Sequence, residues 1–219
     1  MCVVLLPPLP FFSFLLRTSL PSHFERTGPQ QTLTVQQNLS GTFIAWYYTA
    51  AYGRTGISPA LSYPDSLNLM LVMNGIGAAG RLGAAALADR VGPLNVLLPC
   101  ALASSLCCFA WTAVRTPAAV YAWAAVLGVV SGGLQALFPA GLTSLTTDVR
   151  AAGLRMGMIF TLVSLCVLAG PPAAGAAIER ARGSYVGAQA LAGTHLLVGA
   201  GFIAASRRVK TGGRWRARL

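Results

Sequence analysis

The chain has 219 residues, of which 55% are hydrophobic and only 10% are charged, and its formal net charge is +11. A soluble domain usually carries about a quarter charged residues, so this composition excludes an ordinary water-soluble surface. Together with a mean hydropathy of +0.63, it indicates a protein whose surface is largely in contact with lipid.

The positive charge does not point to nucleic acid. The basic residues lie at the ends of apolar runs and in the tail from Arg207 to Arg218, instead of sharing one polar face with interleaved aromatic residues. No metal or cofactor site is predicted either. His23 and His195 are isolated, and every cysteine lies in an apolar run without a CxxC pair.

The first 53 residues are predicted to contain no full membrane span. Residues 1–16 are apolar but are interrupted by three prolines, which fits a signal-like segment or a wrongly assigned gene start. The polar stretch from Arg17 to Asn38 indicates a loop, so residues 1–38 form no stable domain in this interpretation. Leu39–Gly53 is apolar but too short to cross a bilayer core of about 30 Å. It is predicted to be a partial helix with an interfacial aromatic belt of Trp46, Tyr47, Tyr48 and Tyr52.

Five apolar segments of about twenty residues follow, and each is long enough to span a membrane. They are Ser66–Ala88, Leu94–Val114, Ala118–Leu142, Arg155–Ile178 and Gly187–Ser206. None alternates with period two, so a membrane β-barrel is not indicated. The predicted fold is therefore an all-α membrane bundle over residues 39–206, followed by a basic cytoplasmic tail over residues 207–219.

The charges predict a topology. If the tail is cytoplasmic, alternation of the spans also places Arg90, Arg150 and Arg155 inside, as the positive-inside rule favours. The outer loops then hold Arg54, Arg115, Arg180 and Arg182.

The small residues of these spans allow two interpretations. Spacings such as Gly128-xxx-Gly132 and Gly153-xxx-Gly157 are typical of closely packed membrane helices. Gly75-Ile-Gly-Ala-Ala-Gly80 also matches the GxGxxG fingerprint of a dinucleotide-binding fold. That fingerprint needs an acidic residue about twenty positions further on, and the sequence there, Asn95 to Cys100, has none.

Arg81 is the residue most indicative of function. It lies well inside a span, where a charge costs about 2.5–3.5 kcal/mol, and Asn74 lies two turns before it. Such a residue usually faces an aqueous cavity or a partner, although its side chain could also reach the nearer interface. Gly170-Pro171-Pro172 is predicted to break the fourth span, as helices near transporter binding sites often do.

Several motifs in this order resemble the second half of the major facilitator superfamily, and in particular its fungal monocarboxylate-transporter-like branch. The stretch Asn74 to Asn95 resembles the region of helices 8 and 9, and Ala88-Asp89-Arg90-Val91-Gly92 resembles the cytoplasmic loop signature. Further matches are Gly128-Val-Val-Ser-Gly132, Pro139, Thr147-Asp148, Gly153 to Gly157, Gly170 to Gly175 and Tyr185 to Gln189.

The resemblance implies alternating access by two six-helix halves, of which this chain matches only the second. It implies that Arg81 pairs with the carboxylate of a small organic anion such as a monocarboxylate. It also implies that Asp89, Arg90 and Gly92 organise the cytoplasmic loop. The aspartate that related animal transporters carry four residues before this arginine is replaced here by Gly77.

The leading hypothesis is thus a multi-pass transporter, not an enzyme, that works in the plasma or vacuolar membrane. It would act with a missing N-terminal half or with a second copy. The alternatives are a non-transporting membrane fragment or mis-split gene product, and a soluble dinucleotide-binding enzyme.

Overall fold

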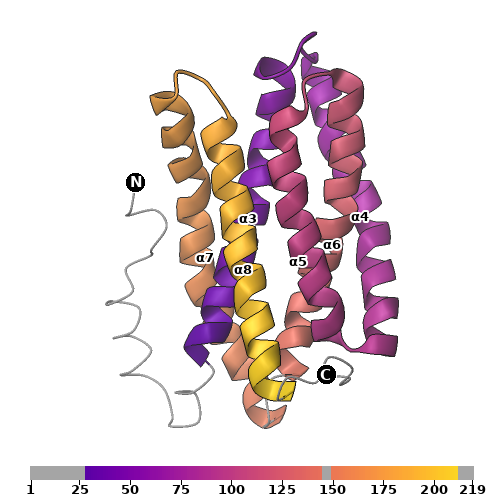
Figure 1. The fold of residues 1–219 in the computed structure, drawn as a ribbon, viewed down its shortest axis with the longest axis vertical. Helices are drawn as coiled ribbons and strands as arrows, with labels where there is room; N and C mark the ends of the chain where they lie inside the picture. Colours follow the sequence, from indigo (N-terminus) through magenta and orange to yellow (C-terminus); the bar gives the residue numbers. More distant parts are fainter. Residues whose placement is uncertain (1–27, 145–148, 212–219) are drawn as a thin grey trace.

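The computed structural model describes residues 28–144 and 149–211, and these residues form six long helices with one short 3-10 turn (Figure 1). No strand occurs in these two ranges. In chain order the elements are α3 (Gly28–Thr55), α4 (Tyr63–Val91), α5 (Pro93–Ala110), η1 (Trp111–Ala113), α6 (Pro117–Ser144), α7 (Val149–Arg180) and α8 (Val186–Thr211).

Successive helices run in opposite directions, so the connections gather at two ends of the bundle (Figure 1). We call the end that holds the α4–α5 turn and the last turn of α8 the inner end, and the opposite end the outer end. Arg90 and Arg208 lie at the inner end, whereas Arg54, Arg115 and Arg180 lie at the outer end. This distribution agrees with the grouping of charges that the alternation of the spans predicts.

The helices pack as pairs around a central α3. α3 contacts α8 on one side and α7 on another, and it reaches α4 and α6 as well. α4 packs along α6, and α5 lies between α6 and α8. α7 contacts mainly α3, so much of its surface has no neighbour in the part of the chain that the structure describes.

Within residues 28–144 and 149–211, four segments are long and apolar enough to cross a membrane: 63–91, 93–113, 117–143 and 186–208. They correspond to four of the segments predicted from the sequence. α7 covers the remaining one, Arg155–Ile178, with an unbroken helix of 32 residues. The chain is an integral multi-pass membrane protein with an all-α fold.

Local sequence explains where α4 and α5 begin and end. Ser62 caps α4 by accepting a hydrogen bond from the Asp65 amide at 3.3 Å, and Pro64 stands in the first turn, where no intrahelical donor is needed. Gly92, with φ 96°, ends α4 in a conformation that favours glycine, and Pro93 then starts α5.

The prediction for residues 28–38 was wrong. α3 begins at Gly28 and includes the polar stretch that was interpreted as a loop, so it is a full helix of 28 residues and not a partial one. The reason is tertiary: α3 packs on α8 and α7, and Thr34, Gln36, Gln37 and Asn38 are buried. Asn38 also donates to the Thr34 carbonyl of its own helix at 2.8 Å. Residues 1–27 lie outside the described part of the chain.

The predicted aromatic belt divides into exposed and buried members. Tyr47 is 67% exposed, but Tyr52 is only 4% exposed and packs edge-to-face on Trp111 and on Tyr185. Trp111 in turn stacks on Trp123, with ring centroids 4.7 Å apart. Tyr52 is therefore part of an aromatic core at the outer end, where it donates a hydrogen bond to the Val114 carbonyl.

Candidate functional site

Arg81 lies in the inner half of α4. At 1.5 Å per residue it is about 27 Å along the helix from Tyr63 and about 15 Å from Val91. A bilayer core of about 30 Å centred on this helix would therefore include the Arg81 backbone. The side chain is half-buried, and no hydrogen bond or ion pair involves it among the described residues.

Asn74 lies on the same side of α4 as Arg81, because seven residues make almost two full helical turns. Its side chain is exposed, and its Nδ2 donates to the Met70 carbonyl of the same helix at 2.9 Å. The amide oxygen accepts no hydrogen bond from the described residues. The two predicted substrate-binding residues thus share one uncovered strip of α4.

Glycines bring α4 and α6 into backbone contact and fix their register. A Cβ on Gly128 would collide with the Met73 carbonyl, and one on Gly132 would collide with the Gly77 carbonyl. A Cβ on Gly80 would likewise collide with the Val129 backbone. These contacts explain why small residues occur at these positions.

The same register places Arg81 level with Gln135 of α6, a residue that the sequence analysis did not select. Gln135 is half-buried, and its Nε2 is enclosed without a hydrogen-bond partner in the described part of the chain. An unpaired buried amide is costly, and in membrane helices polar residues of this kind often mark a substrate path. In the sequence, Gln135 could have been noticed as a single amide side chain within the apolar segment Ala118–Leu142.

The GxGxxG match does not form a dinucleotide site. Gly75 to Gly80 lie in the middle of a 29-residue helix, whereas the fingerprint requires a strand, a tight turn and a helix N-terminus. Gly77 and Gly80 face the α6 backbone, while nothing lies within 4 Å of a Cβ built on Gly75. The soluble dinucleotide-binding alternative is therefore wrong.

The loop motif lies at the α4–α5 turn. Asp89 and Arg90 are exposed in the last turn of α4, and neither forms an ion pair among the described residues. Gly92 has a clear geometric role, since its φ of 96° allows the chain to turn and its amide donates to the Ala88 carbonyl at 2.8 Å.

The predicted break at Gly170-Pro171-Pro172 was also wrong. α7 remains helical through both prolines, and the hydroxyl of Tyr48 donates to the Pro171 carbonyl at 2.7 Å. Gly175 makes this contact possible, because a Cβ there would lie 2.7 Å from the Tyr48 hydroxyl. Pro171 and Pro172 lack the amide donors that the carbonyls of Val167 and Leu168 would otherwise accept. The bond from Tyr48 to the Pro171 carbonyl therefore does not replace a lost donor; it ties α7 to α3.

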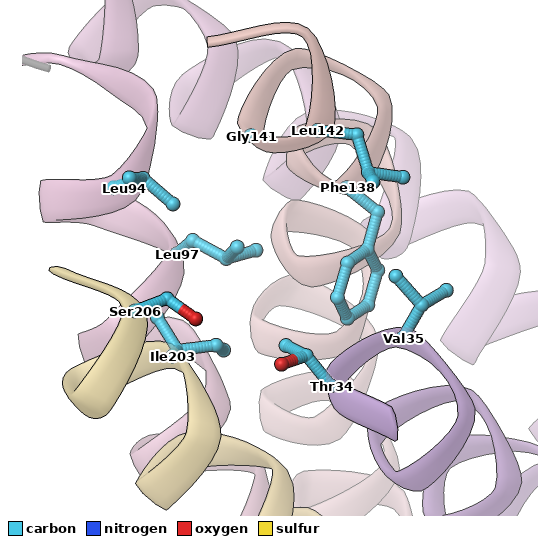
Figure 2. A pocket seen from close by; sticks show the side chains of 9 residues that line it. All are labelled: Thr34, Val35, Leu94, Leu97, Phe138, Gly141, Leu142, Ile203 and Ser206. Carbon is cyan, nitrogen blue, oxygen red and sulfur yellow. The ribbon is translucent and has the colours of Figure 1, made fainter. Parts of the chain in front are cut away.

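A small cavity lies near the inner end, between α3, α5, α6 and α8. Figure 2 shows its lining: apolar side chains surround the hydroxyls of Thr34 and Ser206. Its volume is about 20 Å³. A water needs about 10–15 Å³ measured in this way, so the cavity has room for about one water and none for an organic anion. It includes neither Arg81 nor Asn74.

A larger pocket of about 180 Å³ lies at the outer end, and we call it the outer pocket. Its lining comes from the end of α3, from η1 and the residues after it, and from the start of α8. Arg81 and Asn74 do not belong to this pocket either. Among the described residues, the Asn74 side chain is exposed and that of Arg81 is half-buried, and neither lines one of these two pockets.

Comparison with known proteins gives homologues among fungal transporters, and no family model matches the chain. An MFS-type transporter of Gibberella zeae is 44% identical over 170 residues, which are 78% of this chain and 38% of that protein. The MFS-type transporter pynF of Aspergillus niger is 30% identical over 178 residues, 81% of this chain and 40% of its own length.

The aspyridones efflux protein apdF of Emericella nidulans is 28% identical over 158 residues, covering 71% of this chain and 32% of that protein. The chain thus spans about a third to two-fifths of the length of these relatives. It is a homologue of fungal MFS-type transporters, and its all-α multi-pass fold is consistent with one half of a major facilitator superfamily protein.

Proposed function

We propose that this chain forms the second half of a transporter that moves a small organic anion, such as a monocarboxylate, by alternating access. The homology to MFS-type transporters is the observation that carries this proposal. Two relatives are named efflux proteins, for aspyridones and for fujikurins, so we infer export as the direction of transport.

Arg81 would bind the carboxylate of the substrate. Three properties support this role: its depth in α4, the absence of an ion-pair partner among the described residues, and the uncovered strip that it shares with Asn74. A guanidinium can donate two parallel hydrogen bonds to a carboxylate, which a lysine ammonium cannot reproduce. Gln135, at the same level on α6, would add an amide donor.

A second six-helix unit would cover this side of the bundle and close the chamber, since alternating access moves two units about a shared site. That unit would be a first half or a second copy of this chain. Asp89, Arg90 and Gly92 would hold the helix ends at the inner end in one of the two conformations. The first half of the Gibberella zeae relative is the natural partner to test, because that relative is 44% identical to this chain.

The experiment compares export of a labelled monocarboxylate from inverted vesicles or yeast cells that express the chain alone or fused to that first half. We expect transport only from the fusion. Arg81→Ala should reduce transport at least about a hundredfold, and Arg81→Lys should recover only part of it, because lysine retains charge but not the bidentate geometry.

The matched control is Arg180→Ala, which removes an exposed arginine at the outer end of α7. Equal transport by the wild-type fusion and by Arg81→Ala would remove Arg81 from the substrate site. No transport by the fusion, at normal expression and with an intact fold, would favour a non-transporting membrane protein.

A further inference from the structure

The outer pocket has chemistry that the proposed transport function does not use. Its volume is about 180 Å³, and polar side chains and backbone form most of its edge. Arg81 lies far away in the inner half of α4, so this pocket is separate from the proposed substrate site.

Arg115 is the charged residue in the lining of the outer pocket, and no carboxylate lines it. Within the described ranges, the guanidinium of Arg115 forms neither an ion pair nor a hydrogen bond; its carbonyl accepts one from the Ser58 amide at 3.1 Å. The pocket therefore presents an uncompensated positive charge.

The first turn of α8 also borders the outer pocket. The Gln189 amide donates to the Tyr185 carbonyl at 2.9 Å, so the amides of the three preceding residues, from Val186 on, have no acceptor within the helix. The N-terminus of a 26-residue helix carries a partial positive charge and readily binds anions.

The side chain of Gln189 gives independent evidence for a ligand. It is only 1% exposed and lines the outer pocket, yet no hydrogen bond between described residues involves its amide group. Tyr185 is already paired with the Thr55 hydroxyl at 2.7 Å, and the Tyr52 hydroxyl donates to Val114. An oxyanion in the pocket would accept hydrogen bonds from the NH₂ group of Gln189.

We propose that the outer pocket binds a phosphate-type oxyanion, held by the Arg115 guanidinium, the Gln189 amide and the first backbone amides of α8. At 1.5 Å per residue α8 is about 39 Å long, which exceeds the bilayer core of about 30 Å. The start of α8 therefore lies at the level of the lipid headgroups. The oxyanion comes from a lipid headgroup or from free phosphate.

The test uses the full chain purified in detergent, with its thermal midpoint followed by tryptophan fluorescence. One arm adds inorganic phosphate and compares it with chloride at equal ionic strength. A second arm reconstitutes the chain in nanodiscs with or without phosphatidic acid in phosphatidylcholine. The variants are Arg115→Gln and Gln189→Leu, and Arg180→Gln is the control because that exposed arginine at the same end does not line the pocket.

We expect the midpoint to rise with one of the two probes, and the apparent affinity to fall about tenfold in each pocket variant while the control keeps it. A response to inorganic phosphate identifies a free anion as a ligand, and a response to phosphatidic acid alone identifies the headgroup. If neither probe raises the midpoint, or if Arg115→Gln and Gln189→Leu respond as the wild type does, the proposal is overturned.

Discussion

The α4–α6 pair and α7 carry the same small-residue spacing with opposite structural results. Gly128 and Gly132 of α6 meet the backbone of α4 so closely that neither position has room for a Cβ. Gly153 and Gly157 of α7 have the same spacing, yet nothing lies within 4 Å of a Cβ built on either. The spacing therefore indicates a helix face that can accept close contact, and the tertiary structure determines whether a neighbour occupies it.

The largest loss of stability is expected where α4 and α6 are in close backbone contact. Gly132→Ala should destabilise the bundle by about 3 kcal/mol, because the new methyl group would collide with the Gly77 carbonyl and force α4 and α6 apart. The measurement is the thermal midpoint in detergent, together with the elution volume on gel filtration. Gly75→Ala is the control, since its Cβ meets open space on α4. Equal losses in both variants would contradict the register described here.

An intermediate effect is expected where α7 does make a close contact. Gly175→Ala should cost about 1–2 kcal/mol, because its Cβ would lie 2.7 Å from the Tyr48 hydroxyl and displace it from the Pro171 carbonyl. In a Tyr48→Phe background the hydroxyl is absent, so the same substitution should cost much less. A double-mutant cycle on stability measures this coupling. Additive effects would show that the hydrogen bond does not hold α7 to α3.

The smallest effect on stability is expected at the open glycines. Gly157→Ala should leave the stability of the chain unchanged or raise it by up to about 1 kcal/mol, because alanine favours the helix and meets no neighbour. The measurement is the thermal midpoint of Gly157→Ala compared with that of the wild type in the same detergent. A loss as large as that of Gly132→Ala would mean that α7 already packs against a partner. In the fused transporter the substitution should reduce transport if a second unit approaches this face.

Much of the fold could be predicted because membrane spans depend on local properties. The four segments able to cross a membrane agree with the apolar segments of the sequence, and their ends coincide with Pro, Gly and Arg residues such as Gly92, Pro93 and Arg115. The first part of α3 could not be predicted, since its polar residues are buried in a helix that packs on helices far away in the sequence.

The candidate site could be predicted only in part. A single arginine inside an apolar segment is visible in the sequence, and Arg81 is still the residue that we propose for the substrate. Gln135 was not predicted, because an amide becomes significant only when its burial and its missing hydrogen-bond partners are known. Gln189 was noted only as part of a family motif, and its burial beside the outer pocket appears only in the structure.

The residues alone were enough to predict that the chain is embedded in lipid, where its four apolar spans lie and which arginines gather at each end. Composition and segment length decide these features, so no long-range contact is needed. The structure was needed to show that Gly132 meets Gly77, that Tyr52 belongs to an aromatic core and that Tyr48 of α3 donates to the Pro171 carbonyl of α7. These features depend on contacts between segments far apart in the chain, because in lipid helix association depends on close packing and shared hydrogen bonds more than on hydrophobicity.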